Sequence, residues 1–299
     1  MTAPIELLKP HELPGRVAVT AGNGGLARLV VTSNASTAEI YPHGAHVTGF
    51  QKTGEPPLIF MSRKSGFAPD KPIRGGVPIC FPWFGNRDGE PSHGFVRITA
   101  WQLVRTAATP DGVVTLQFAL PALPGRAAWK DLRTGFTVTV ADTLTMELAA
   151  TNESCDQTLE FEECLHTYFQ VGDIAAVSIT GLQHAAYLDN AAGGNGERKI
   201  QTEPALRIPR ETNRLYLDTT GMVEIRDDAF RRTIRVEKYH SHSTVVWNPW
   251  TTQKLPDDFD PAEHQRMVCV ESGNVKQNKI VLPPGKTSAL KVVLSSRAN

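Results

Sequence analysis

The chain has 299 residues, of which 40% are hydrophobic and 21% are charged, so it is long enough to bury one large core. Lysine plus arginine and aspartate plus glutamate both number 31, which excludes a general electrostatic attraction to nucleic acid or to an anionic membrane. If basic residues bind an anionic ligand, they must therefore do so as a local cluster.

The N-terminal stretch MTAPIELLKPHELPGR contains no continuous apolar run, because Lys9, Pro10 and Pro14 interrupt it. It fits neither a secretory signal peptide nor a membrane anchor. We therefore expect a cytoplasmic protein that does not bind membranes.

Short runs rich in β-branched residues recur along the chain, each bounded by Gly, Pro, Asn or Asp. They lie at 16–21, 27–33, 38–42, 114–120, 136–141, 143–150, 177–181, 223–227, 233–239, 243–248, 267–272 and 289–296. No long segment of the sequence shows the apolar periodicity of an amphipathic helix. Their spacing predicts an all-β fold, an antiparallel sandwich, rather than a parallel α/β sheet.

Two polar loops, at 191–199 and 251–265, interrupt the later runs. Neither is typical of an interdomain linker, so we expect a single domain over residues 1–299. The second loop could close over a binding site.

Several familiar motifs occur in incomplete form. The segment GNGGLA at 22–27 precedes a β-type run where a dinucleotide-binding fold needs a helix. The segment GKTS at 285–288 lacks the earlier glycine of a phosphate loop, because Ile280 stands there. The histidine pairs have no completing ligand pattern, and the cysteines lack a C-x-x-C spacing, so we expect reduced thiols and no metal site. These residues are His43, His46, His240, His242, Cys80, Cys155, Cys164 and Cys269.

The segment from Arg74 to Arg97 combines glycines, prolines, cations and a histidine in a mixture that no regular helix would keep. It predicts an ordered loop that lines a pocket. If residues 92–99 are extended, the two-residue period places His93, Phe95 and Arg97 on one face. The histidine and the arginine could then address opposite ends of one small anionic ligand, and their spacing suggests a sugar phosphate.

Residues 158–173 alternate between apolar and polar positions, with Glu160, Glu162 and His166 on the polar face. Nearby carboxylates would raise the pKa of His166 and keep it protonated at neutral pH, which suits a general acid. Taken alone, the pattern fits a half-exposed strand with a solvated polar face equally well or better.

Two carboxylates complete the candidate set. Glu271 ends the apolar run 267–272, where partial desolvation would raise its pKa and make it a stronger base when ionised. Asp218 precedes Thr and Gly, an arrangement that is common at capped turns. Either residue could also be an ordinary polar position.

The segments PIRGGVPICFPWFG, SHGFVR, LHTYFQVGDI, VVWNPW and VCVES occur in this order. Together they resemble the hexose-6-phosphate mutarotases, also called glucose-6-phosphate 1-epimerases, of the aldose 1-epimerase superfamily, over most of the chain. The resemblance implies a β-supersandwich of the galactose mutarotase type, a small-molecule substrate, and no metal or organic cofactor. It implies interconversion of the α and β anomers of a hexose 6-phosphate. We expect a monomer that binds no nucleic acid.

The resemblance also implies roles for three residues in the chemistry. His166 and Glu271 would be the catalytic acid and base, and His93 would lie beside the anomeric centre. Glu271 would take the proton of the anomeric hydroxyl while His166 gives one to the ring oxygen, which opens the ring to an aldehyde.

The same resemblance implies the substrate-binding residues. Arg74 and Arg97 would hold the phosphate, for which the planar guanidinium fork is well suited. Asp218 would bind sugar hydroxyls. Relatives often carry a glutamine substrate contact before the residue matching His93, whereas this chain has Ser92, so Ser92 is a candidate contact that departs from the family pattern.

Two other classes of protein would account for part of this set of residues. A non-catalytic sugar-phosphate sensor would keep both arginines but would gain nothing from an acid and a base together. A glycoside-processing enzyme would need two carboxylates flanking a glycosidic bond, whereas these motifs supply one glutamate and two histidines. The mutarotase interpretation accounts for all of them.

Overall fold

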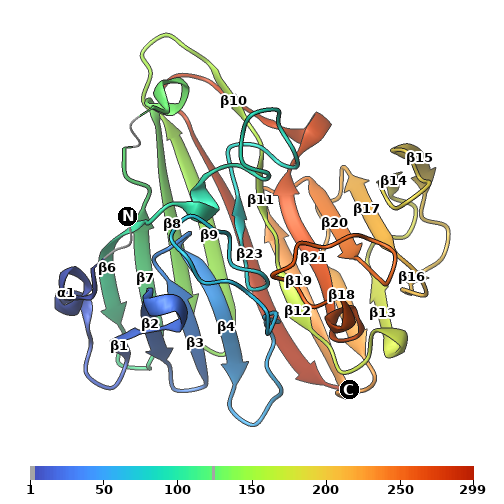
Figure 1. The fold of residues 1–299 in the computed structure, drawn as a ribbon, viewed down its shortest axis with the longest axis horizontal. Helices are drawn as coiled ribbons and strands as arrows, with labels where there is room; N and C mark the ends of the chain where they lie inside the picture. The colour runs from blue at the N-terminus through green and yellow to red at the C-terminus, as the bar shows by residue number, and fades with distance from the viewer. Residues whose placement is uncertain (1–3, 123–124) are drawn as a thin grey trace.

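The computed structural model describes residues 4–122 and 125–299, and β-strands are its main regular structure (Figure 1). The strand pairs of its named sheets are antiparallel, as in the pairing of β8 (Leu132–Val140) with β9 (Leu144–Asn152). The all-β sandwich predicted from the sequence is confirmed. Among the described residues, no helix has both the length and the apolar character needed to cross a membrane.

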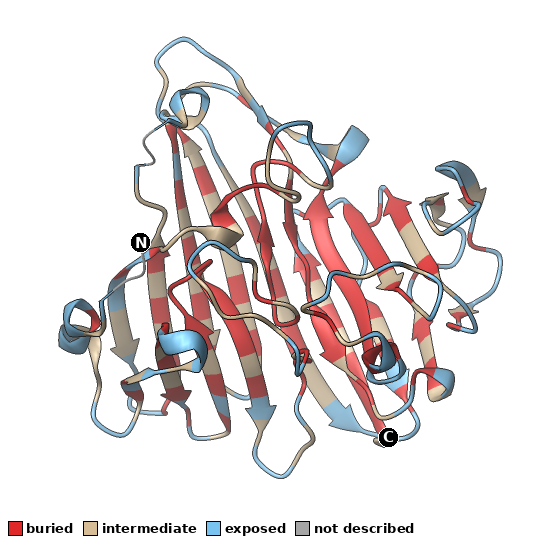
Figure 2. Ribbon diagram, in the orientation of Figure 1, coloured by how far each residue is buried: buried red, intermediate tan, exposed pale blue. Residues whose placement is uncertain are grey.

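One layer is a nine-stranded sheet with the order β16-β13-β18-β19-β23-β9-β8-β7-β6. Its other strands are β6 (Gln102–Ala108), β7 (Val114–Ala119), β13 (Val177–Thr180), β16 (Ala205–Leu206), β18 (Val223–Asp227), β19 (Arg232–Tyr239) and β23 (Thr287–Ala298). Burial alternates along the central strands, because successive side chains point to opposite faces (Figure 2).

The second sheet has eight strands in the order β15-β14-β17-β20-β21-β11-β5, with β12 also paired to β21. They are β5 (Ile79–Cys80), β11 (Glu163–Leu165), β12 (Tyr168–Gln170), β14 (Ala186–Asp189), β15 (Glu197–Ile200), β17 (Thr212–Leu217), β20 (Ser243–Asn248) and β21 (Met267–Asn274). Strand β21 lies between β20 and β11 and is buried along its whole length. A polar side chain on β21 is therefore removed from bulk water.

A four-stranded sheet and a strand pair complete the β structure: β1 (Val17–Ala21), β2 (Ala27–Thr32), β3 (Ser36–Tyr41), β4 (His46–Lys52), and β10 (Leu159–Phe161) with β22 (Ile280–Leu282). The helical segments are short: α1 (Ile5–Leu8), η1 (Lys9–His11), η2 (Asn23–Gly25), η3 (Val96–Ile98), η4 (Ala127–Trp129), η5 (Ile174–Ala176), η6 (Pro261–Arg266) and η7 (Lys276–Asn278). One hydrophobic cluster joins the three large sheets, with Ile40, Phe136 and Val270 among its members.

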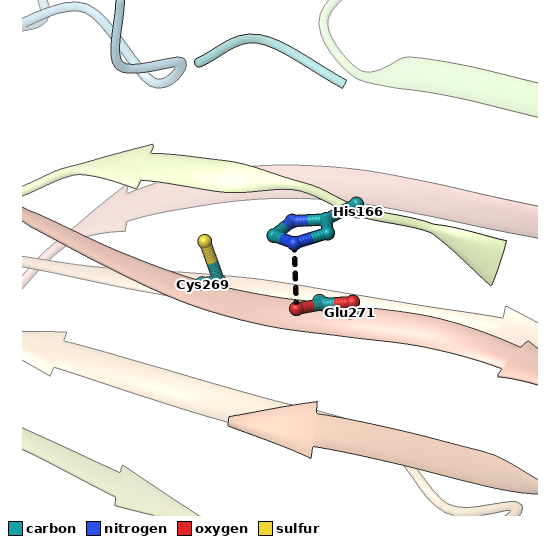
Figure 3. Close-up of side chains that lie close together, drawn as sticks. All are labelled: His166, Cys269 and Glu271. Carbon is teal, nitrogen blue, oxygen red and sulfur yellow. Dashed lines mark ion pairs between the residues drawn. The ribbon is translucent and has the colours of Figure 1, made fainter. Parts of the chain in front are cut away.

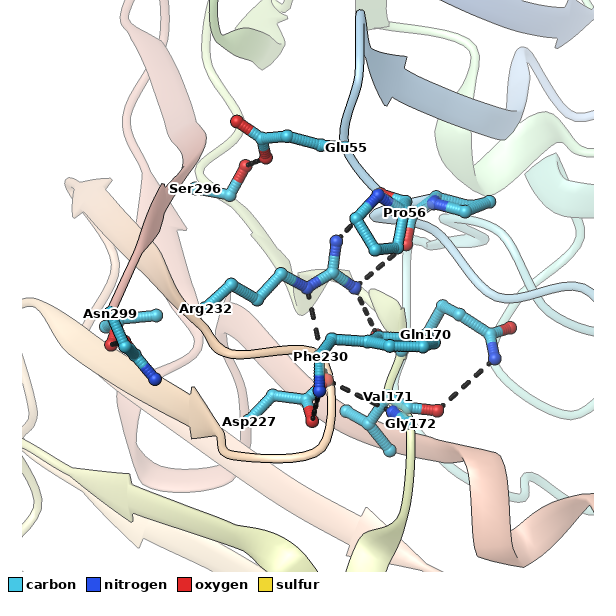
Figure 4. Close-up of polar contacts among 12 residues, drawn as sticks. Glu55, Pro56, Gln170, Val171, Gly172, Asp227, Phe230, Arg232, Ser296 and Asn299 are labelled. Carbon is cyan, nitrogen blue, oxygen red and sulfur yellow. Dashed lines mark hydrogen bonds and ion pairs between the residues drawn. The ribbon is translucent and has the colours of Figure 1, made fainter.

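A buried arginine joins three separate parts of the chain (Figure 4). Arg232, at the start of β19, is 3% exposed, and it donates hydrogen bonds of 2.8 and 2.9 Å to the carbonyls of Pro56 and Pro57. It also donates a 2.7 Å bond to the carbonyl of Gln170, and Asp227 lies 4.0 Å from its Nε atom. Because Gln170 ends β12, this arginine fixes β12 against the nine-stranded sheet.

Two of the predicted local structures are wrong. Residues 92–99 are not extended, because His93 and Gly94 have φ angles of 62° and 77° and η3 follows. Phe95 consequently packs in the core instead of sharing a face with Arg97. Gly94 is required at the turn, since a Cβ atom there would lie 1.9 Å from the carbonyl oxygen of Phe81. A two-residue period cannot reveal such a turn.

The segment 158–173 is also not a half-exposed strand. It is divided into β10, β11 and β12, and His166 of the predicted polar face is buried, as are Cys164 and Tyr168, which alternate with the apolar positions in the same way. Strand β11 is an interior strand, paired with β21 on one edge and β5 on the other. Next to it, the rings of Tyr168 and Trp247 pack on His166, so the segment lies inside the fold. Burial, rather than solvation, sets the chemistry of this segment.

Candidate active site

A cavity of about 990 Å³ opens over β20 and β21. Loop residues 84–98 line one wall, and residues 253–259 line another. Of the residues predicted to form the site, six line this cavity: Arg74, Ser92, His93, Arg97, His166 and Glu271. The fold thus brings together residues that are up to 197 positions apart, from Arg74 to Glu271.

His166 and Glu271 both line the cavity, and their side chains form a contact pair (Figure 3). The Nε2 atom of His166 lies 3.3 Å from Oε1 of Glu271, and the two side chains are 11% and 1% exposed. Glu271 is held by the ladder of β21, and the backbone N–H of His166 donates a 3.0 Å bond to the carbonyl of Pro78. Both groups are therefore fixed by backbone pairing.

Burial determines the protonation of this pair. It raises the pKa of Glu271 well above its ordinary value, and the Sγ–H of Cys164, 3.6 Å from Oε2, opposes this shift. Burial also lowers the pKa of His166 well below its ordinary value, with His93 and Arg97 adding to the effect. Both shifts disfavour the charged forms of the pair, the carboxylate of Glu271 and the imidazolium of His166.

The raised pKa predicted for His166 from its flanking carboxylates is wrong. Glu160 pairs with Lys279 at the surface, and Glu162 accepts hydrogen bonds from the backbone of Phe84 and Lys276. Glutamates that are neighbours of His166 in the sequence therefore have partners elsewhere. The raised pKa predicted for Glu271 agrees with its complete burial.

His93 lies opposite the pair, with its ring centroid 5.6 Å from that of His166. The backbone N–H of Gly85 donates to Nδ1 of His93 at 3.3 Å, which leaves its Nε2 as the donor of a neutral ring. Burial lowers the pKa of His93 to about 3, and Arg97, Arg74 and Lys276 contribute. A neutral N–H donor is thus available beside the pair.

Among the described residues, each of the two predicted phosphate-binding arginines donates from its side chain to one acceptor. Nη2 of Arg97 donates to the carbonyl oxygen of Ser92 at 2.5 Å. Nε of Arg74 donates to Oδ1 of Asp258 at 3.0 Å. Each guanidinium keeps further N–H groups, because arginine has five. Ser92 therefore orients Arg97 through its backbone.

Asp218 does not line the cavity. It is exposed, has a φ angle of 55°, and accepts a 3.4 Å hydrogen bond from the side chain of Gln277. Its position at a turn matches the capping role that its sequence context also allowed. A contact between Asp218 and a sugar in the cavity is therefore not supported by this arrangement.

Sequence reasoning missed several lining residues. Tyr168 stacks on His166 with ring centroids 4.8 Å apart and an interplanar angle of 11°, and Trp247 packs edge-on at 6.1 Å. Both fall within quoted motifs, LHTYFQVGDI and VVWNPW, which could have indicated them. Phe259 lies in the 251–265 loop, which was expected to be able to close over a site, whereas Lys276, after β21, had no comparable signal.

His166, Cys269 and Glu271 also bring three possible metal-ligand atoms within 4.8 Å of one another (Figure 3). Histidine, thiolate and carboxylate are ligands that zinc uses. Burial raises the pKa of the Cys269 thiol well above its ordinary value, which disfavours the thiolate. A metal at this position would occupy the atoms through which the His166–Glu271 pair can move a proton.

Comparison with known proteins gives a consistent assignment. A family model described as aldose 1-epimerase matches residues 28–295. The chain is 33% identical over 284 residues to a protein of Cenchrus ciliaris provisionally named glucose-6-phosphate 1-epimerase, covering 91% of this chain and 85% of that protein. A protein of Escherichia coli K12 with the same provisional name is 30% identical over 257 residues, with 85% of each covered.

Solved structures agree with the sequence matches. A crystal structure of a provisionally named mutarotase from Salmonella typhimurium superimposes with a TM-score of 0.88 at 28% identity, covering 97% of this chain and 96% of that one. A galactose mutarotase-like protein from Clostridium acetobutylicum, at 14% identity, shares the fold with a TM-score of 0.74 over 95% and 98% of the two chains. The resemblance found in the sequence is confirmed, and the chain belongs to the aldose 1-epimerase family of sugar isomerases.

Proposed function

We propose that this protein interconverts the α and β anomers of a hexose 6-phosphate, with glucose 6-phosphate as the substrate that the names of its relatives suggest. The observation that carries the proposal is the shared cavity, which holds a buried His166–Glu271 pair and the two arginines Arg74 and Arg97. A proton-transfer pair serves the anomeric centre, and the arginines serve the phosphate.

The reaction needs only proton transfers. The carboxylate of Glu271 takes the proton of the anomeric hydroxyl while the imidazolium of His166 protonates the ring oxygen, so the C1–O5 bond opens. Rotation about C1–C2 then exposes the other face of the aldehyde. Closure with the two groups in reversed roles gives the other anomer, and Nε2–H of His93 stabilises the charge that develops on the C1 oxygen.

The substrate itself prepares this protonation state. In the free site, the positive charge of Arg97 contributes to the low pKa of His166. A bound phosphate dianion offsets that charge, so it favours transfer of the pair's proton from Glu271 to His166. The acid and base therefore take their working forms when a phosphorylated sugar is present.

Exchange NMR without added metal tests the proposal. We expect the protein to accelerate anomer exchange of glucose 6-phosphate far more than that of glucose, after subtraction of the uncatalysed rate. The difference should lie in kcat/KM, because the free sugar lacks the group that the arginines bind. Equal acceleration of both sugars would contradict the phosphate assignment, and acceleration of neither would contradict the enzyme assignment.

A further inference from the structure

The loop at residues 251–265 contacts both ends of the cavity through two adjacent residues. Asp258 contacts the phosphate end, and Phe259 contacts the end that carries the His166–Glu271 pair. Lys254 and Leu255 of the same loop also line the cavity. The loop is therefore a physical connection between the two ends.

At the phosphate end, Oδ1 of Asp258 accepts the 3.0 Å bond from Nε of Arg74, and both side chains are 23% exposed. The contact uses one edge of the guanidinium and leaves the terminal N–H groups for an incoming anion. Across residues 4–122 and 125–299, Asp258 is the acidic partner of Arg74, and Arg97 has no acidic partner. Asp258 therefore orients Arg74 instead of blocking it.

At the other end, Phe259 is buried and its ring packs on the rings of Phe60, Tyr168 and Trp247, with centroids 6.1, 6.4 and 6.5 Å apart. Tyr168 is the ring stacked on His166. A shift of Phe259 therefore reaches the imidazole through one intervening side chain.

The loop is tied down on both sides of these residues. The side chain of Gln253 accepts a 2.8 Å bond from Nε1 of Trp247. On the other side, the backbone N–H of Asp260 donates to Oγ of Ser62 at 3.3 Å, and Glu263 accepts a 3.0 Å bond from the backbone of Arg63. Asp258 and Phe259 therefore lie in a part of the loop that is anchored on both sides.

We propose that Asp258 and Phe259 couple occupancy of the phosphate subsite to the catalytic imidazole, so that a free phosphate dianion activates anomer exchange of an unphosphorylated hexose. This inference rests on the proposed function. Binding energy from a non-reacting part of a substrate can be used to organise the reacting groups, and it does not require a covalent link to the reacting part. The cavity of about 990 Å³ has room for the two pieces together.

The electrostatics of the site act in the same direction. Arg97 contributes to the low pKa of both His93 and His166, and Arg74 contributes to that of His93. An inorganic phosphate dianion between these arginines offsets their charge whether or not it is attached to a sugar. The free dianion thus acts both on Arg74, which Asp258 links to the loop, and on the electrostatic field at the two histidines.

The experiment measures anomer exchange of glucose while inorganic phosphate is raised at constant ionic strength, with buffer-catalysed exchange subtracted. We expect saturable activation of at least about tenfold, which requires only about 1.4 kcal/mol of the dianion's binding energy. Asp258→Ala should lose most of this activation, and Asp258→Asn should keep part of it because its amide oxygen can still accept from Arg74. Each rate is divided by the same variant's rate without phosphate.

Asp257→Asn is the matched control, because it removes the same charge from an exposed neighbour that does not line the cavity. It should be activated as the parent is. Phe259→Leu should weaken activation without changing the phosphate concentration that gives half of it. Absence of activation in the parent, or activation of the Asp258→Ala and Phe259→Leu variants equal to that of the parent, would overturn the inference. Turnover of glucose 6-phosphate by the parent, measured first, separates that result from failure of the proposed function.

Discussion

The two ends of the cavity are built in different ways. His166 and Glu271 come from strands, or from positions next to them, in the eight-stranded sheet, and their side chains are 11% and 1% exposed. Arg74 and Arg97 come from the irregular segment and the short η3 turn that precede β6, and within the described part of the chain each side chain donates to one acceptor. One end is organised by desolvation, and the other by hydrogen bonds that leave donors free.

This difference indicates what each end can do. Desolvation moves the pKa values of Glu271 and His166 in opposite directions, which costs stability but prepares a proton-transfer pair. Arg74 remains partly exposed, whereas burial lowers the pKa of Arg97, so a bound dianion would offset a charge that Arg97 holds in a desolvated position. Substitutions at one end should therefore change the chemistry, and substitutions at the other should change substrate preference.

The largest effect is expected from Glu271→Gln. It keeps the shape of the side chain but removes the base, so anomer exchange should fall by about 10² to 10⁴. Binding of glucose 6-phosphate should persist through Arg74 and Arg97. Exchange NMR gives the rate, and calorimetric titration gives the affinity.

Glu163→Gln is the matched control for this change. Glu163 is also a fully buried glutamate, but it contacts Asn274 and does not line the cavity. Its replacement should leave exchange close to the parent rate. A near-parent rate in Glu271→Gln would remove this residue from the chemistry and would favour a sugar-phosphate sensor.

A smaller and more selective effect is expected from the arginines. Arg97→Ala and Arg74→Ala should each lower kcat/KM for the phosphorylated sugar. The expected loss corresponds to about 2 to 5 kcal/mol of transition-state stabilisation, because a charge-assisted contact is lost. The slow exchange of free glucose should change little in the absence of phosphate. Parallel measurements on both sugars check this selectivity, and a proportional loss on both with an intact fold would assign the arginines to structure or chemistry instead.

Much of the fold could be predicted because its strands have strong local patterns. Each β-branched run found in the sequence coincides with a strand, for example 136–141 with β8 and 143–150 with β9. The strands that were missed include β4, with the sequence HVTGFQK, and β17, with TNRLYL. Their histidine, glycine, asparagine and arginine residues weaken the local pattern, and pairing with neighbouring strands stabilises them instead.

Only the residues of the candidate site that lie within recognisable sequence motifs could be predicted. The family motifs located His166 and Glu271, but Asp258 lies 184 positions from Arg74 and has no motif of its own. The direction of the His166 pKa shift was wrong because glutamates close in sequence, such as Glu160, have partners elsewhere. Contacts between distant segments, and the burial that they cause, cannot be obtained from local alternation.

The smallest effect concerns stability, and it tests whether the buried end is strained. The pKa of Glu271 is raised in the folded protein, so above its ordinary value of 4.5 the unfolded state has lost a proton that the folded state keeps. The folded state binds more protons in this window, and the free energy of unfolding therefore falls as pH rises. Glu271→Gln lacks this carboxyl group, so its stability relative to the parent should increase with pH. The increase is about 1.4 kcal/mol for each pH unit between the ordinary and the raised pKa of Glu271.

The contributions of His166 and Glu163 to the pH dependence of stability can be told apart from that of Glu271. His166 has a lowered pKa, so its own contribution changes below its ordinary value of 6.5 and has the opposite sign, with stability rising as pH rises. Burial raises the pKa of Glu163 to about 7, so the gain in Glu163→Gln should level off near that pH. Between pH 7 and 9, urea unfolding should therefore show a continuing gain for Glu271→Gln and a constant gain for Glu163→Gln. Parallel lines for both variants and the parent above pH 7 would mean that Glu271 is already ionised in the folded protein, and that its burial does not hold the proton on the carboxyl group.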